Sequence, residues 1–225
     1  VAMWRDFPAA VQERTGLGVC VYSRRGYGKS DPCHDHPQPV DYLHREARSA
    51  LPDLLCALEI DRPILLGHSD GASIALIYAG EGTAPAPLGV IVFAPHVFVE
   101  PETTFGIARA RVAFEGEGLR RALAKYHDDP DSAFFTWNLA WLMPEFIRDW
   151  NLESLVETIR CPLTVIQGED DEYGTAKQYD SIRARHPGPT DIVVLPDCGH
   201  SPHRDQREAT LDAVAAHVGN LKVAA

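Results

Sequence analysis

Five short apolar runs, each followed by a segment with helical periodicity, constrain the fold of this chain more than any other feature. The runs occupy residues 17–23, 63–69, 88–97, 162–169 and 191–197. They are rich in Val, Ile and Leu with little polar alternation, which is typical of strands buried on both faces of a parallel sheet. Such strands, alternating with helices, predict an α/β fold with a mostly parallel sheet and helices on both faces.

Two helical patterns accompany these strands, one between the first two runs and one after the last. Apolar residues recur on one helical face across residues 43–58, and Pro52 is expected to break or kink that helix. The spacing of apolar residues from Leu211 to Val218 predicts a further helix after the last strand. Both patterns agree with the α/β interpretation.

The alternation is interrupted between residues 100 and 158, where helical stripes replace strand-like runs. This stretch predicts a helical insertion at 100–158 in a core domain made of 1–99 and 159–225. Its aromatic residues have two interpretations: they pack the insertion against the main domain, or they line an apolar pocket. The candidates for the pocket are Phe134, Trp137 and Trp141.

Composition narrows the class of protein. The chain has 225 residues, 45% of them hydrophobic, and a formal net charge of -11, which disfavours nucleic acid and anionic lipid as partners. No apolar run is long enough to span a bilayer, and charges occupy the start "VAMWRDFPAAVQER", where a signal peptide would be apolar. The five cysteines are scattered without a C-x-x-C pair, as in reduced cytoplasmic proteins. We therefore expect a cytoplasmic protein that acts on a small molecule; the sequence does not indicate its oligomeric state.

The stretch "ILLGHSDGASIAL" places Ser69 between Gly67 and Gly71, where a buried strand is predicted to become a helix. A tight strand-to-helix turn needs small neighbours and lifts the serine hydroxyl to a helix N-terminus, which favours negative charge. The N–H of Asp70, which follows the serine, would donate to an oxyanion. Its carboxylate is unusual there; it either points away along the helix or disfavours anionic substrates. The alternative is a glycine-rich turn in which Ser69 only caps the helix.

A serine nucleophile needs a base and an acid that orients the base. His200, in "VVLPDCGHSPHRD", follows the last predicted strand, and a carboxylate cluster in "TVIQGEDDEYGT" follows the strand before it. Catalytic groups of open α/β sheets gather at the carboxyl ends of the strands, so all three loops are expected at one edge. The chain order serine, acid, histidine is one of the known triad orders.

Four motifs together resemble the α/β-hydrolase fold family: "YSRRGYGKSD", "GHSDG", "QGEDDEYGT" and "CGHSPHRD", with similarity from Trp4 nearly to the end of the chain. The resemblance implies the fold, a Ser-His-Asp triad and a helical cap over the site. The family places its acid three residues after the glycine that ends the strand, which selects Asp171; a one-residue shift would select Asp170 instead.

The sequence departs from this family at its front. Family members carry a strand ending in a His-Gly or glycine-rich turn, which supplies a second oxyanion N–H, before the helix that "WRDFPAAVQERTG" resembles. The chain contains neither the strand nor the turn, and it begins with Val1 instead of Met. We therefore expect an N-terminally incomplete α/β-hydrolase whose own folding and activity are open.

Further histidines flank the motifs. His68 precedes Ser69 and is expected to pack at the turn, and His96 follows a strand end, from which it could face the substrate pocket. The stretch "CHDHP" resembles a metal cluster in composition, but no second ligand group matches it, so no metal and no cofactor is predicted.

The sequence thus predicts a serine hydrolase that cleaves a small to medium, rather apolar carboxylic ester through Ser69, His200, Asp171 and an acyl-enzyme. The alternatives on the same triad are a thioesterase, a lactonase or a C–C bond hydrolase. A non-catalytic ligand-binding member of the fold, or an inactive fragment, is the alternative from another class.

Overall fold

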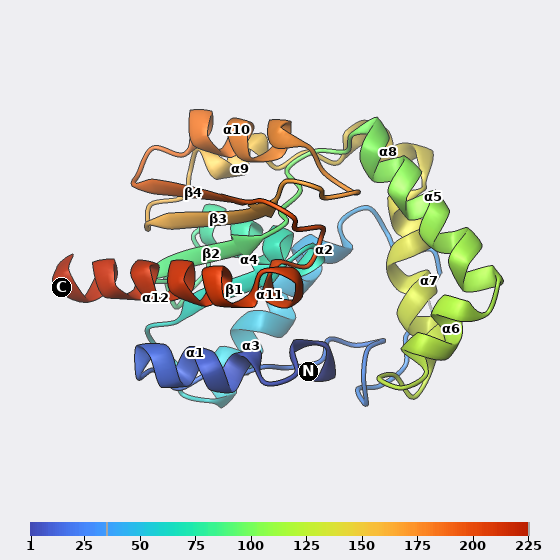
Figure 1. Ribbon diagram of the computed structural model, residues 1–225, viewed down its shortest axis with the longest axis horizontal. Coiled ribbons are helices and arrows are strands. Elements are labelled where there is room, and N and C mark those ends of the chain that lie inside the picture. The colour runs from blue at the N-terminus through green and yellow to red at the C-terminus, as the bar shows by residue number, and fades with distance from the viewer. Residues whose placement is uncertain (35, 225) are drawn as a thin grey trace. The chain divides into compact units, whose positions relative to one another are not determined.

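The computed structural model describes residues 1–34 and 36–224 (Figure 1). It divides into two compact units, each described by itself below. The first unit comprises Val1–Val40 and Val99–Trp150, and the second comprises Asp41–Phe98 and Asn151–Ala225.

The second unit is built on a parallel sheet, as the apolar runs predict. Its strands are β1 (Ile64–His68), β2 (Gly89–Phe93), β3 (Leu163–Gly168) and β4 (Thr190–Leu195), in the spatial order β1-β2-β3-β4. Every neighbouring pair is parallel. All residues of β2 and β3 are buried, which explains their continuous apolar runs. The carboxyl ends of the four strands therefore meet at one edge.

Helices cover both faces of this sheet. Figure 1 shows α12 (Arg207–Ala224) crossing in front of the strands and α4 (Asp70–Gly80) behind them. The other helices of the unit include α2 (Tyr42–Arg45), α3 (Leu51–Ala57), α9 (Glu153–Val156), α10 (Ala176–Arg185) and α11 (Pro202–Asp205). The α/β class and the helix after the last strand are confirmed.

The helix predicted across residues 43–58 is interrupted as Pro52 requires. The π-helix η2 (Glu46–Ala50) separates α2 from α3, and Pro52 lies in the first turn of α3. Proline has no N–H to donate and its ring clashes with the carbonyl one turn earlier. Widening the preceding turn to π geometry accommodates that ring without ending the helix.

The prediction of a strand at residues 17–23 is wrong. These residues adopt no strand structure and follow α1 (Phe7–Thr15), which ends at Gly16 in the left-handed conformation. Val19 in this run is 40% exposed. An apolar segment becomes a strand only when a neighbour takes up its backbone N–H and C=O groups, and no described residue pairs with it in a ladder.

The first unit is helical. Besides α1 and the short η1 (Ala2–Trp4), it contains α5 (Pro101–Glu115), α6 (Gly118–Leu123), α7 (Pro130–Trp141) and α8 (Pro144–Asp149). Between residues 100 and 158, all of which are described, the only β-type pairing is an isolated bridge from Asn151 to Phe98. Proline is the first residue of α5, α7 and α8 and the second of α1, positions at which its missing N–H has no intrahelical acceptor.

Candidate active site

Ser69 lies at the sharp turn between β1 and α4. Its backbone has φ 54° and ψ −118°, a strained conformation for a residue with a side chain. The N–H of Ser69 donates to the Phe93 carbonyl at 3.0 Å, and the Ser69 carbonyl accepts from the N–H groups of Ala72 and Ser73 at 2.8 and 3.1 Å. These backbone hydrogen bonds to β2 and α4 hold the turn in place.

Of the two glycines that flank the turn, only Gly67 is sterically required. A Cβ on Gly67 would overlap the backbone of Gly71 and Ala72, because α4 passes directly over the end of β1. A Cβ on Gly71 would have no atom within 4 Å. The sequence suggested that both glycines allow β1 and α4 to approach closely, but this approach depends on Gly67.

A chain of hydrogen bonds connects Ser69, His200 and Asp171, which we call the serine–histidine cluster. His200 Nε2 lies 3.0 Å from Ser69 Oγ. His200 Nδ1 lies 2.9 and 3.0 Å from the two carboxylate oxygens of Asp171. The Asp171 side chain is fully buried, whereas 14% of the His200 side chain is exposed. A neutral imidazole in this position can accept the serine proton at Nε2 while it donates Nδ1–H to the carboxylate.

The environment of Asp171 keeps its carboxyl group ionised. Burial by itself raises the pKa of Asp171, but the hydrogen bond and charge of His200, together with the N–H of Tyr173, outweigh burial and lower the pKa below its ordinary value. Tyr173 N–H donates to Asp171 Oδ1 at 2.9 Å, and Gln167 Nε2 donates to Oδ2 at 2.6 Å. Asp170, the alternative acid, is exposed, and it is Asp171 whose carboxylate bonds His200.

The loops that carry Asp171 and His200 are fastened to each other where β3 ends. A Cβ on Gly168 would overlap the carbonyl oxygens of Cys198 and Gly199, so the two loops touch at this glycine. The Asp170 N–H donates to the Cys198 carbonyl at 2.9 Å, and the His200 N–H donates to Glu172 Oε2 at 3.3 Å. The relative position of Asp171 and His200 is thus set by backbone contacts as well as by their own hydrogen bond.

His68 and His96 surround His200 without reaching Ser69 by any hydrogen bond found among the described residues. His68 Nε2 lies 2.6 Å from the His200 carbonyl, and His96 Nε2 lies 3.1 Å from the Tyr173 carbonyl. Their rings lie 5.0 and 5.9 Å from the His200 ring, between centroids. Burial, followed by the charge of His200, lowers the pKa of His68 and of His96. The pKa of His68 lies well below the ordinary histidine value. Both imidazoles are therefore neutral at pH 7.

Asp70 begins α4, so its N–H belongs to the first turn, where backbone N–H groups have no intrahelical acceptor. Its carboxylate Oδ2 accepts a hydrogen bond from the Tyr42 hydroxyl at 2.9 Å. Tyr42 is 7% exposed and belongs to α2. The Asp70 carboxylate is thus turned toward α2; whether it disfavours anionic substrates is a separate matter of function.

The aromatic residues named as pocket candidates lie in the first unit. Phe134 stacks on Phe114 with ring centroids 4.0 Å apart, and Trp137 meets Phe134 edge-on at 5.2 Å. Trp141 contacts Phe146 and Trp150, at 4.7 and 4.8 Å. Phe134 and Trp141 are buried among these rings, while Trp137 is half-buried.

Sequence reasoning did not identify Gln167, Tyr42 or Tyr173 as neighbours of the triad candidates. A signal existed for Gln167, because it is a polar residue near the end of an otherwise apolar strand, "LTVIQG". Nothing in the local pattern distinguishes Tyr42 from an apolar helix residue, and its contact with Asp70 depends on tertiary packing.

Nothing in the described part of the chain groups three His, Cys, Asp or Glu side chains so that they could hold a metal ion. Within "CHDHP", Asp35 lies outside the described residues, while Cys33 exchanges hydrogen bonds with Ser132 through its backbone. Among the described helices, none has the length and apolar character that crossing a membrane requires.

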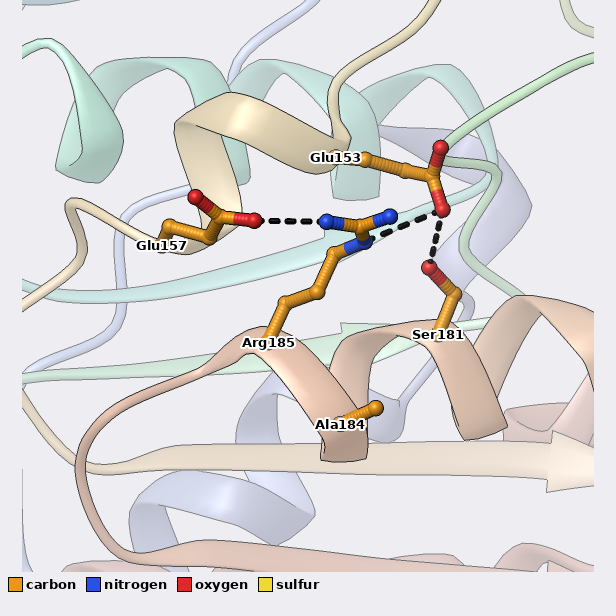
Figure 2. Close-up of a pocket in the computed structure, with 5 residues that line it drawn as sticks. All are labelled: Glu153, Glu157, Ser181, Ala184 and Arg185. Carbon is orange, nitrogen blue, oxygen red and sulfur yellow. Dashed lines mark hydrogen bonds and ion pairs between the residues drawn. The ribbon is translucent and has the colours of Figure 1, made fainter.

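A second polar cluster lines a shallow surface pocket formed by α9 and α10, and we call it the α9–α10 cluster (Figure 2). Arg185 donates from Nε to Glu153 at 3.0 Å and from Nη1 to Glu157 at 2.5 Å. Ser181 Oγ donates to the same Glu153 oxygen at 2.7 Å. Figure 2 shows both glutamates directed at the one guanidinium group, so a single positive charge is shared by two carboxylates.

Comparison with known proteins places these observations in a family. The model of the alpha/beta hydrolase family matches residues 2–213. Serine hydrolase BPHL of Homo sapiens is 28% identical over 190 residues, which are 82% of this chain and 64% of the human protein. The chain thus spans less than two thirds of the length of that relative.

Solved structures share the fold at low sequence identity. A thermophilic esterase from Thermogutta terrifontis is 19% identical with a TM-score of 0.69, covering 96% of this chain and 86% of the esterase. The enol-lactonase from Burkholderia xenovorans LB400 is 21% identical with a TM-score of 0.70, covering 97% of this chain and 86% of the lactonase. At these identities the likeness shows the fold alone.

Proposed function

The chain belongs to the alpha/beta hydrolase family, and from that premise we propose that it cleaves small to medium, rather apolar carboxylic esters with Ser69 as nucleophile. One observation carries the proposal: the His200 imidazole bridges Ser69 Oγ and the buried Asp171 carboxylate, at 3.0 and 2.9 Å. This is the arrangement that a serine needs to lose its proton as it attacks a carbonyl.

In the proposed reaction, Ser69 Oγ attacks the ester carbonyl carbon while His200 Nε2 takes the hydroxyl proton. The Asp171 carboxylate holds Nδ1–H and stabilises the imidazolium that forms. The tetrahedral intermediate collapses, and His200 returns its proton to the departing alkoxide, which leaves as an alcohol. Water, deprotonated by His200, then attacks the acyl-enzyme and releases the carboxylic acid and free Ser69.

The oxyanion of the intermediate is assigned to the backbone N–H of Asp70, at the first turn of α4. An N–H group at this place combines a hydrogen bond with the positive end of the helix dipole. The Asp70 carboxylate, which accepts from Tyr42, brings negative charge to the same turn. We therefore expect neutral acyl groups to be cleaved faster than anionic ones.

The apolar preference is part of the proposal and rests on the helical stretch at residues 100–158, which we propose to be a cap over a core of 1–99 and 159–225. Of its aromatic residues, the half-buried Trp137 is proposed, with His68 and His96 beside the cluster, as a pocket residue. Phe134 and Trp141 are buried among other rings and are proposed to shape the pocket only through their packing. We further propose that the protein works in the cytoplasm, in keeping with five cysteines that are all free thiols.

The first test is intact-mass spectrometry after treatment with a fluorophosphonate, which reacts with activated serines. One adduct on the wild-type chain, absent from Ser69→Ala and present on Ser201→Ala, supports the proposal. Ser201 is the matched control, since it lies beside His200 and its side chain caps no helix. A folded wild-type chain that takes up no adduct would refute the triad.

A substrate panel then tests the bond that is cleaved. Nitrophenyl esters from acetate to octanoate, a thioester and a lactone are compared by kcat/KM. A preference for longer acyl esters supports an apolar ester as substrate, and a preference for acetate contradicts it. Faster cleavage of the thioester or lactone would reassign the substrate class on the same triad. Ligand binding without turnover, unchanged in Ser69→Ala, would indicate a non-catalytic member of the family.

A further inference from the structure

Gln167 is a buried polar residue in β3 that makes direct contact with the proposed triad. Its side chain is 1% exposed, and its amide Nε2 donates to Asp171 Oδ2 at 2.6 Å. Gln167 directly precedes Gly168, the glycine at which the acid and histidine loops touch. The residue is therefore anchored in the sheet while its amide reaches the carboxylate of Asp171.

Three donors together fix the Asp171 carboxylate. Gln167 holds Oδ2, the Tyr173 N–H holds Oδ1, and His200 Nδ1 lies between the two oxygens at 2.9 and 3.0 Å. Rotation of the carboxylate toward or away from His200 would break the bond to Gln167 or to Tyr173. The plane of the carboxylate is thus set from outside the triad.

The orientation of the Gln167 amide follows from the same contacts. Only the NH₂ group can donate to a carboxylate, so Nε2 must face Asp171. This choice leaves Gln167 Oε1 buried with no hydrogen-bond partner among the described residues. A buried acceptor without a partner is destabilising. A residue chosen only for the stability of β3 would be apolar, as its strand neighbours Val165 and Ile166 are.

We propose that Gln167 is a positioning residue for hydrolysis, whose amide N–H aligns the Asp171 carboxylate with His200 Nδ1 and keeps the shared proton on the histidine. A hydrogen bond donated to a carboxylate stabilises its ionised form and weakens it as a base. Gln167 does not contact the reacting atoms. The inference rests on the proposed function, because it assigns a role within that triad.

Two variants test the donor. Gln167→Met keeps the length and volume of the side chain and removes the N–H, so the rate of fluorophosphonate labelling and kcat should fall about tenfold with KM unchanged. That loss is far smaller than the factor of about 10⁴ expected when the triad acid itself is replaced. Gln167→Glu is isosteric and carries a donor only when it is protonated.

The glutamate variant predicts a change in pH dependence. A protonated carboxyl at position 167 can donate to Asp171, whereas an ionised one repels it. The other titratable groups coupled to Asp171 include His200, His96 and the Cys198 thiol, whose pKa is raised to about 11 by burial and next by the charge of Asp205. The ratio of variant to wild-type kcat should therefore fall as the pH rises from 6 to 9. A structural role alone would leave this ratio flat.

Gln178→Met is the matched control. Gln178 is also a fully buried glutamine, but its amide bonds the backbone of Val97 and Phe98, away from Asp171. This variant should lower the melting temperature at least as much as Gln167→Met while kcat and the labelling rate stay within a factor of two of wild type.

A readout independent of turnover completes the test. The carboxyl ¹³C signal of Asp171 is followed by NMR across pH. In Gln167→Met it should titrate at higher pH than in the wild-type protein, and in Gln178→Met it should titrate as in the wild-type protein. An unchanged titration together with unchanged labelling of Gln167→Met would overturn the inference. If wild-type Ser69 is not labelled while the titration still shifts, the proposed function fails and the coupling of Gln167 to Asp171 stands.

Discussion

The serine–histidine cluster and the α9–α10 cluster are made of similar parts but differ in what surrounds them. Each contains a serine hydroxyl, carboxylate oxygens and a nitrogen-bearing side chain, which is an imidazole in the first and a guanidinium in the second. Ser69 faces the acceptor nitrogen of an imidazole, whereas Ser181 donates to Glu153, which is also ion-paired with Arg185. A guanidinium stays protonated at neutral pH and cannot accept the serine proton. A serine beside a carboxylate is therefore not enough for nucleophilic chemistry. The serine also needs a neighbouring nitrogen that can accept its proton, which only the imidazole provides.

Burial is the second difference between the two clusters. The Asp171 side chain is fully buried, whereas the Arg185 and Glu157 side chains are 38% and 52% exposed. Charges in contact with water are screened, so the ion pairs of the α9–α10 cluster contribute little to the free energy of unfolding, and substitutions there should be tolerated. A buried carboxylate with three donors cannot be altered without disturbing its partners.

The largest expected effect comes from Asp171→Asn. The amide keeps the shape of the carboxylate but can present its NH₂ group to His200, which favours the wrong imidazole tautomer. We expect kcat to fall about 10⁴-fold with the fold retained. Stopped-flow or discontinuous ester hydrolysis measures the loss, and Asp170→Asn is the control. Comparable losses in both variants would mean that the acid has been assigned to the wrong residue.

Gly67→Ala should have the next largest effect. The added methyl would meet the backbone of Gly71 and Ala72, which cannot move without displacing α4 from β1. We expect a loss of about 1–3 kcal/mol in the free energy of unfolding, measured by urea denaturation. Gly71→Ala, whose methyl meets nothing within 4 Å, should be tolerated. Equal destabilisation by both variants would contradict the account of the turn.

Most of the sheet unit could be predicted from the sequence, for reasons that particular residues make clear. Every residue of β2 and β3 is buried, whichever face of the sheet its side chain points to, so local composition and tertiary role coincide there. Gly67 and Pro52 act on their own backbone, and their effects on the β1–α4 turn and on η2 are therefore local.

Where the prediction failed, the cause was not local. Residues 17–23 have the composition of a strand, but a strand depends on a partner elsewhere in the molecule. The contacts of Gln167 and Tyr42 with Asp171 and Asp70 likewise depend on how distant elements pack, which the local pattern of a single sequence does not contain. Ser69 and His200 could be identified from the sequence because their loops follow strands of one parallel sheet.

The pH dependence of stability should follow the buried histidines. Burial lowers the pKa of His217, which bonds Thr164 Oγ1 at 2.8 Å, as it does for His68 and His96. As the pH falls, the histidines of the unfolded chain take up protons near pH 6.5, before the buried histidines of the folded chain do. Their contribution to stability is therefore complete above about pH 6.5 and is lost as the pH falls toward the folded-state pKa values.

Urea denaturation at several pH values between 8 and 5 measures this loss. Each histidine adds at most about 1.4 kcal/mol per pH unit to the slope. His217→Gln should reduce the slope. Asp171 affects stability in a lower pH range. Because its pKa is lowered in the folded chain, its contribution to the free energy of unfolding is lost only when the pH falls below about 3.9. A stability that is flat from pH 8 to 5 would contradict the burial of neutral histidines.

Arg185→Ala should have the smallest effect. It removes both ion pairs of the α9–α10 cluster, and pairs this exposed contribute about 0–1 kcal/mol to the free energy of unfolding. Ester hydrolysis and fluorophosphonate labelling should be unchanged. A large loss of activity in this variant would show that the two clusters are not independent.

The central claim is that His200 activates Ser69, and the rate of fluorophosphonate labelling tests it most directly when the modified residue is identified by peptide mass mapping. Wild-type protein should be labelled at Ser69, and His200→Ala should be labelled at least about 10³-fold more slowly while its melting curve stays cooperative. Equal rates in the two proteins, or a label on Ser181 in place of Ser69, would contradict the account.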